Sequence, residues 1–255
     1  MLRCILVVVG FALTSPAFAH FPMLLPVAAS GQTEKPVTIV YQWGHPFEHQ
    51  LFDAPKPEGV GVMTPDGSET AIEGVQKTEV PGEVGKKVSA YRFSFTPKMR
   101  GDHTFFLIAP PIWLEEEKLF LHDTVKVVYH VQTQNAWDLA TPLPFELVPL
   151  TRPYGLQPGM VFQATVLRDR ALLGGVRVEV ERYNPTPPKE LPADEQITRL
   201  VKTDPNGVLT CTLTDSGWWC MTAAINGEPR ERDGKKYPVK RRATLWVFVD
   251  EKPAK

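Results

Sequence analysis

The chain has 255 residues, with 28 basic and 29 acidic side chains and a formal net charge of −1. This balance excludes a general electrostatic attraction to nucleic acid or to anionic lipid. Proline contributes 25 residues, about twice its average share of protein sequences, and prolines at this density interrupt helices. The length allows one large or two ordinary domains. The composition therefore favours an all-β protein.

Residues 1–19 have the three parts of a secretory signal peptide. Arg3 supplies the basic start, an apolar run follows, and Ala17 and Ala19 provide small residues at a cleavage site. No stretch of the sequence reaches the roughly 18 apolar residues that a transmembrane helix needs. We therefore expect a periplasmic or secreted protein of 255 − 19 = 236 residues that begins with His20 and has no transmembrane segment.

Alternating apolar and polar residues predict several strands in the first half of the chain. The alternation is clear over residues 37–43, 88–95 and 124–132. After the first of these strands comes a loop-like segment, Gly44-His-Pro-Phe-Glu-His49, with two histidines four residues apart. Residues 115–120 form the one plausible helix of this half, and a short one.

A boundary is expected around residues 135–144, where Pro142-Leu-Pro144 ends the alternation. The second half again shows short strand patterns, over residues 161–166, 174–180 and 244–249, separated by turn-forming residues. Many short strands with regular turn signals are typical of a β-sandwich. We predict two tandem β-sandwich domains, a histidine-rich one over residues 20–140 and a second over residues 145–250.

The mature chain keeps two cysteines, Cys211 and Cys220. The sequence around them indicates a hairpin with a tight turn centred on Asp215 and Ser216. In that register the two cysteines would lie directly opposite each other, where cross-strand Cβ atoms are about 4.5–5.5 Å apart. An oxidising compartment then favours a disulfide, and two buried thiols or two metal ligands are the alternatives.

All six histidines lie in the first half of the chain: His20, His45, His49, His103, His122 and His130. Histidine is the commonest ligand of borderline metals such as nickel, copper and zinc. A mature N-terminal His20 would offer both an α-amine and an imidazole, and the α-amine has a pKa of about 7.7–8.0, so a metal ion can displace its proton near neutral pH.

His45 and His49 are the expected partners of His20, because a turn can bring their rings together. Glu48 is a candidate oxygen ligand, or an acceptor that orients a histidine ring. His130 is a weaker candidate, on the polar face of its strand, either exposed or a ligand from a neighbouring strand. In the competing interpretation, His45 caps a turn and His49 is solvated.

The second half resembles the prealbumin-like, carboxypeptidase-regulatory type of sandwich. The matching segments are Pro158-Gly159, Gly174-Gly-Val-Arg-Val178, Thr203-Asp-Pro-Asn-Gly-Val208 and Ser216-Gly-Trp-Trp219. Such modules usually bind or brace other molecules.

Nearly the whole mature chain resembles an exported bacterial family associated with nickel and cobalt uptake. The resemblance rests on His20-Phe21, on Gly44-His-Pro-Phe-Glu48 and on the second sandwich. It implies a periplasmic accessory to a membrane transporter, with a nickel or cobalt ion as the bound metal.

No catalytic motif is recognisable: Gly-x-Ser-x-Gly, His-Glu-x-x-His and a phosphate-binding glycine loop are all missing from the sequence. We therefore expect a binding protein rather than an enzyme. Two other hypotheses stay open at this point. One is a copper enzyme with a histidine brace, which also starts at a cleaved histidine on a β-sandwich. The other is a sandwich that binds sugar or protein without a metal.

Overall fold

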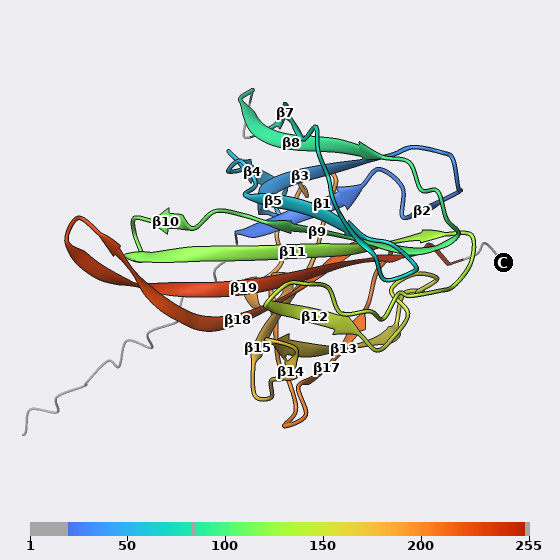
Figure 1. Ribbon diagram of the computed structural model, residues 1–255. Helices are drawn as coiled ribbons and strands as arrows, with labels where there is room; N and C mark the ends of the chain where they lie inside the picture. Colours follow the sequence, from blue (N-terminus) through green and yellow to red (C-terminus); the bar gives the residue numbers. More distant parts are fainter. Residues whose placement is uncertain (1–19, 83–84, 253–255) are drawn as a thin grey trace, which may run out of the picture.

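The computed structural model describes residues 20–82 and 85–252. The expected signal peptide, residues 1–19, lies outside this described part. Three stacked sheets, here called A, B and C, make up the described chain (Figure 1). The predicted all-β class is thus confirmed. Within the described residues, no helix is both long and apolar enough to cross a membrane.

Sheet B is the central layer and contains strands from both halves of the chain. In order across the sheet, its strands are β16 (Arg199–Lys202), β15 (Arg177–Arg182), β18 (Gly217–Arg232), β19 (Lys235–Val249), β11 (Leu119–Val131), β9 (Gly101–Ile108), β5 (Gly59–Met63) and β6 (Glu69–Ala71). The short strands β10 (Ile112–Leu114) and β2 (Ser30–Gly31) also pair with β11.

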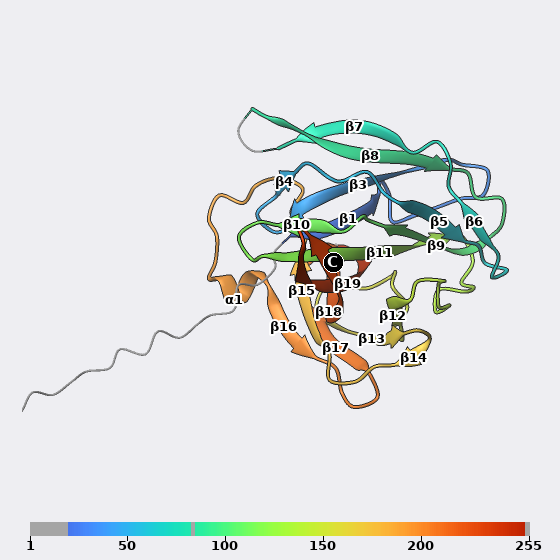
Figure 2. The ribbon, with the colours of Figure 1, turned by 60° about the vertical axis from the view of Figure 1, so that its left-hand side comes forward.

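Sheets A and C are the outer layers. Sheet A consists of β1 (Phe21–Pro26), β3 (Val37–His45), β8 (Lys87–Phe95) and β7 (Gln76–Pro81), with β4 (Gln50–Phe52) paired to β3. Sheet C consists of β12 (Phe145–Pro149), β13 (Met160–Arg168), β14 (Ala171–Leu172) and β17 (Val208–Leu213). A single helical turn, α1 (Asp194–Ile197), follows the proline-rich loop after β15 (Figure 2).

The two faces of sheet B belong to two different cores, as strand alternation requires. On β19, Trp246 packs into the core beneath sheet A, whereas its neighbours Leu245 and Val247 pack into the core beneath sheet C. On β18, Cys220 faces the first core and Met221 the second. Each half of the chain thus builds a sandwich against the same central sheet.

The two halves meet where β11 pairs in parallel with β19. A buried ion pair lies on each face of this seam. Asp123 on β11 and Arg242 on β19 are register partners, joined by two hydrogen bonds of 2.8 and 2.7 Å. On the other face, Lys126 donates to Glu146 of β12 at 2.5 Å. The expected domain division at residues 140–145 stays a prediction, and the shared sheet shows how the halves are joined.

The predicted cysteine hairpin is wrong. Cys211 lies on β17, which pairs with β13 in sheet C, whereas Cys220 lies on β18 in sheet B. The turn between these strands carries the chain from one sheet to another. The two side chains belong to cores on opposite faces of sheet B, and both thiols are free. Burial raises the pKa of Cys211 to about 11 and raises that of Cys220 well above its usual value.

The short helix expected over residues 115–120 is also absent. Residues 115–118 form the turn between β10 and β11, and residues 119 and 120 already belong to β11. The strands expected over 37–43 and 88–95 are confirmed as parts of β3 and β8, and the strand expected over 124–132 is confirmed as part of β11, which ends at Val131.

Candidate metal centre

His20 and His45 lie side by side at one edge of sheet A. The antiparallel pairing of β1 with β3 places Phe21 opposite Gly44, so the preceding His20 falls next to His45. Their ring centroids are 4.6 Å apart, with the ring planes at 65°. The structure therefore places these two histidine rings in contact, and their role as metal ligands stays a prediction.

Two aromatic side chains surround this pair. The indole of Trp43 stacks on the His20 ring at 4.7 Å and 17°, and the Phe52 ring lies 5.1 Å from His20 and 5.4 Å from His45. Trp43 is the register partner of Phe52 in the β3–β4 pair. The histidine rings are therefore held in an apolar surround that restricts their rotation.

Gly44 allows β4 to lie close against β3. A Cβ at this position would come within 2.1 Å of the Gln50 carbonyl oxygen. A side chain there would push β4 away, and with it Phe52, which packs on both histidines. The close packing of β4 against β3 thus explains why position 44 is occupied by glycine.

Burial lowers the pKa of His20 from 6.5 to about 4, with further lowering by His45 and Arg242 and a smaller opposing effect of Asp123. The imidazole is consequently neutral at physiological pH, which is the form that binds metals.

Beneath the histidines lies the buried Asp123–Arg242 pair. The Arg242 guanidinium carbon is 6.0 Å from the centroid of the Phe21 ring, one residue after His20. Tyr41, on β3, is fully buried, and its hydroxyl has no hydrogen-bond partner within the described chain. Burial, and then the charge of Asp123, raise the Tyr41 pKa. The floor of the site is thus polar, although no solvent reaches it.

His49 turns away toward the second half of the chain. Its Nδ1 lies 2.9 Å from the Asn184 carbonyl oxygen, and its ring lies 5.7 Å from Tyr183. Asn184 also binds the loop through its own amide groups, to the carbonyls of Pro46 and Phe47 at 3.0 and 2.6 Å. In Figure 2 the segment after β15 rises along β4 before it descends to α1. The loop that follows His45 is therefore anchored by residues more than 130 positions away.

Glu48 lies near another carboxyl group, Glu181. Glu181 is fully buried on β15, where it accepts hydrogen bonds from the Phe47 amide at 3.1 Å and the Thr198 hydroxyl at 2.5 Å. Burial raises its pKa to about 8, and the charge of Glu48 adds to the rise. One Glu48 oxygen is shielded from solvent without a hydrogen bond in the described residues.

His130 belongs to a separate cluster at the seam of β9 and β11. Its Nδ1 is 2.7 Å from the buried carboxylate of Asp102, and its ring stacks on Tyr154 at 4.0 Å. The Tyr154 hydroxyl and the Asn135 amide donate to the same carboxylate at 3.0 and 2.9 Å. This arrangement ties the 150–158 segment to the first sandwich.

Of the residues predicted for a metal, the structure thus brings together His20 and His45, and it gives His49, Glu48 and His130 other contacts. In residues 20–82 and 85–252, no three histidine, cysteine, aspartate or glutamate side chains form a metal-ligand group. Sequence patterns did not point to Trp43 and Phe52 as the walls of the site. Their position opposite the histidines follows only from the β1–β3–β4 register.

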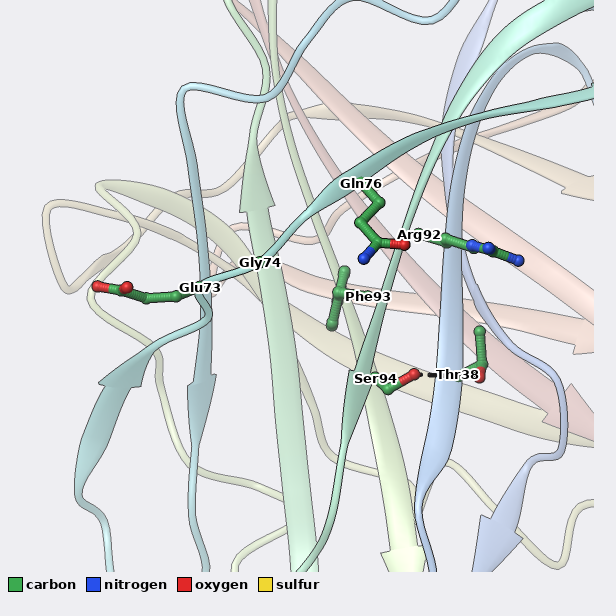
Figure 3. A pocket seen from close by; sticks show the side chains of 7 residues that line it. All are labelled: Thr38, Glu73, Gly74, Gln76, Arg92, Phe93 and Ser94. Carbon is green, nitrogen blue, oxygen red and sulfur yellow. Dashed lines mark hydrogen bonds between the residues drawn. The ribbon is translucent and has the colours of Figure 1, made fainter.

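A cavity of about 330 Å³ on sheet A offers no comparable chemistry (Figure 3). Thr38 and Ser94 are hydrogen-bonded to each other there at 3.3 Å. The charged side chains of Glu73 and Arg92 point away from each other, to opposite sides of the view. Because its charged side chains do not converge, this cavity is a weaker candidate for the functional site than the histidine pair.

Fold and site together define a β-sandwich protein with two paired histidines in an aromatic surround at the edge of one sheet. Residues 17–227 match the family described as Domain of unknown function (DUF4198). The match spans more than half of the chain, so the chain belongs to this family. A search of curated proteins found no match.

Solved structures show only distant similarity. A DUF4785 family protein from Legionella pneumophila is 9% identical with a TM-score of 0.32, over 80% of this chain and 52% of that one. Salmonella alpha-2-macroglobulin is 13% identical with a TM-score of 0.28, over 92% of this chain and 15% of that one. An I-band fragment of titin is 13% identical with a TM-score of 0.24, over 89% and 65%. The chain spans about half of the Legionella protein, and similarity at this level says nothing about function.

Proposed function

We propose that this protein is an exported metal-binding accessory protein, which captures nickel or cobalt in the periplasm and presents it to a membrane transporter. The observation that supports the proposal most is the contact between His20 and His45, with ring centroids 4.6 Å apart. The choice of nickel or cobalt as the metal, and of a transporter as the partner, rests on the resemblance to a nickel and cobalt uptake family.

The residues at the site fit a transition metal. Cleavage after Ala19 would give His20 a free α-amine, so that one residue forms a chelate ring and His45 adds a third nitrogen. A set of nitrogen donors suits nickel(II) and copper(II), whose complexes favour square-planar or tetragonal geometry. The lowered pKa of His20 removes proton competition at its imidazole, which leaves the α-amine proton to be displaced.

Metal affinity should therefore depend on the new N-terminus. The test is calorimetric titration of the mature protein with Ni²⁺, Co²⁺ and Cu²⁺, beside a form with one alanine added before His20 and a His45→Ala variant. Both changes should weaken metal binding by tenfold or more. The control His122→Ala, which removes a histidine of β11 outside the proposed ligand set, should leave the affinity unchanged. Equal affinity in all four proteins would contradict the proposal.

A copper enzyme with a histidine brace is the second candidate, and the same three nitrogens favour it. Copper(II) binds such donors more tightly than nickel(II) in the Irving–Williams order. Formation of hydrogen peroxide by the copper-loaded mature protein with a reductant would support this candidate. Loss of peroxide formation in His45→Ala should accompany it. A protein that binds none of the three metals would favour the metal-free sandwich that binds sugar or protein.

A further inference from the structure

A second cavity, of about 890 Å³, lies over the part of sheet B that the second half contributes. Its walls come from β15, β16, β18 and β19, from the segment that precedes β15, and from Arg168 at the end of β13 in sheet C. This volume is more than twice that of the cavity in Figure 3. It is not formed by any residue proposed to bind the metal.

Strand alternation shows which face of the sheet forms the floor. Thr222 and Ala224 of β18 line the cavity, whereas Met221 and Ala223 between them pack into the core beneath sheet C. The floor is thus the face of sheet B that is turned away from sheet C. On this face, sheet A covers the neighbouring strands, and the cavity occupies the part beyond it.

Positive charge predominates around the cavity. Arg168, Arg177 and Lys240 line it, and Glu179 is the one acidic side chain among the described lining residues. Lys240 is half-buried and donates to the Asn226 side-chain oxygen at 2.6 Å, across the β18–β19 pair. Burial raises the pKa of Glu179, against an opposing effect of Arg242. An anion would meet three cations and one carboxyl group here.

Apolar side chains complete the lining. Leu200 of β16 lines the cavity and is 60% exposed although it is a large aliphatic residue, whereas the lining residues Leu173 and Ile225 pack against the core beneath sheet C. An exposed leucine in a concave surface that also carries charged side chains favours a ligand with a carbon body. The volume also exceeds what a single tetrahedral ion would fill.

We propose that this cavity binds a small organic anion, with its carboxylates on Arg177 and Lys240 and its carbon body on Leu200. Arginine suits carboxylates because its planar guanidinium donates two parallel hydrogen bonds. Lys240 fixes the other end of the anion from β19, which is separated from β15 by β18. The site is independent of the histidine pair, so binding is expected of the metal-free protein.

The probes are citrate and phthalate, with inorganic phosphate as an anion that has no carbon body. Calorimetric titration of the metal-free mature protein should show both organic anions bound, and phosphate at least tenfold more weakly. The double variant Arg177→Gln/Lys240→Gln should weaken citrate binding about tenfold or more, since two charge-assisted hydrogen bonds are lost. A Leu200→Ser variant should weaken phthalate binding more than citrate binding.

Two controls separate this proposal from the metal site and from misfolding. Lys35→Gln, an exposed cation on sheet A's side of the molecule, and His45→Ala should bind citrate as the wild type does, and circular dichroism should show every variant folded. Failure of the wild type to bind either organic anion would overturn the proposal, as would an unchanged affinity in the double variant. An affinity for phosphate equal to that for citrate and phthalate would refute the role of Leu200 as an apolar contact. None of these outcomes depends on whether His20 binds a metal.

Discussion

The buried Asp123–Arg242 pair should be essential to the stability of the seam between the two halves. We consider the substitution Asp123→Asn, which keeps the shape of the side chain and removes its charge. In the wild type, two hydrogen bonds of 2.8 and 2.7 Å join the side chains, which are 0% and 1% exposed. The variant removes the carboxylate charge of Asp123 from beside the buried Arg242 guanidinium.

Breaking a buried ion pair by removing one partner destabilises a protein by about 3–5 kcal/mol. In a protein of this size, 1 kcal/mol shifts the melting temperature by roughly 2–4 °C. Asp123→Asn should therefore lower the melting temperature by roughly 6–20 °C. Arg242 lies close to the Phe21 ring and lowers the His20 pKa, whereas Asp123 raises it, so loss of the Asp123 charge should also weaken binding of a metal cation.

Differential scanning calorimetry of the metal-free protein lacking residues 1–19 measures the first effect. Asp233→Asn is the matched control, since the Asp233 side chain is 85% exposed and the change there should shift the melting temperature very little. The double variant Asp123→Leu/Arg242→Met removes both charges and should recover much of the lost stability. A melting temperature of Asp123→Asn equal to that of Asp233→Asn would refute the reasoning, because the pair would then be contributing nothing.

Four further predictions concern the site and its surroundings. Gly44→Ala should destabilise the β3–β4 hairpin and weaken metal binding at least tenfold by calorimetry, since the new Cβ would lie 2.1 Å from the Gln50 carbonyl oxygen; Gly74→Ala, with no atom within 4 Å of its Cβ but also a positive φ, controls for backbone strain. Burial raises the Glu181 pKa from 4.5 to about 8, so the folded state keeps a proton that the unfolded state has lost, and stability should fall as pH rises between about 4.5 and 8. Urea denaturation across this range should show a much flatter pH dependence for Glu181→Gln, and an unchanged slope would contradict the assignment. Asn184→Ala removes the 2.6 Å hydrogen bond to the Phe47 carbonyl and should weaken metal binding by roughly 2–10-fold, given about 0.5–1.5 kcal/mol per hydrogen bond, whereas a surface change such as Lys189→Ala should have no effect. Cys211 and Cys220 should react with a thiol reagent only after unfolding, and both should react without prior reduction. Detection of a disulfide between them by mass spectrometry would refute the separation of the two thiols.

The strands of this protein were predictable because their pattern is local. Residues 37–43 and 124–132 alternate with period two, and each became part of a strand with one apolar side in the core beneath sheet A. The helix predicted over residues 115–120 failed for an equally local reason. Its acidic residues occupy a turn between β10 and β11, and a run of charged residues is as compatible with a turn as with a helix.

The cysteine prediction failed because a turn does not specify which sheet the next strand joins. The residues between β17 and β18 suit a tight hairpin, and in the protein they carry the chain across the second core instead. Likewise, nothing near His49 in the sequence indicates Asn184, which lies 135 positions away and determines where the histidine ring points. Contacts of this kind depend on how the two halves pack together.

The sequence analysis grouped His20 with His45 because of their residue type and an expected turn, whereas the contact in the structure comes from strand pairing. Because β1 pairs antiparallel with β3, the start of β1 lies beside the end of β3, which places His20 beside His45. What surrounds the pair comes from both halves: Trp43 and Phe52 from sheet A, and Arg242 from β19. The loop after His45 is held by β15 and the segment that follows it. The second sandwich therefore acts on the site through direct contacts, and a change in its packing against sheet B should alter the geometry of the two histidines.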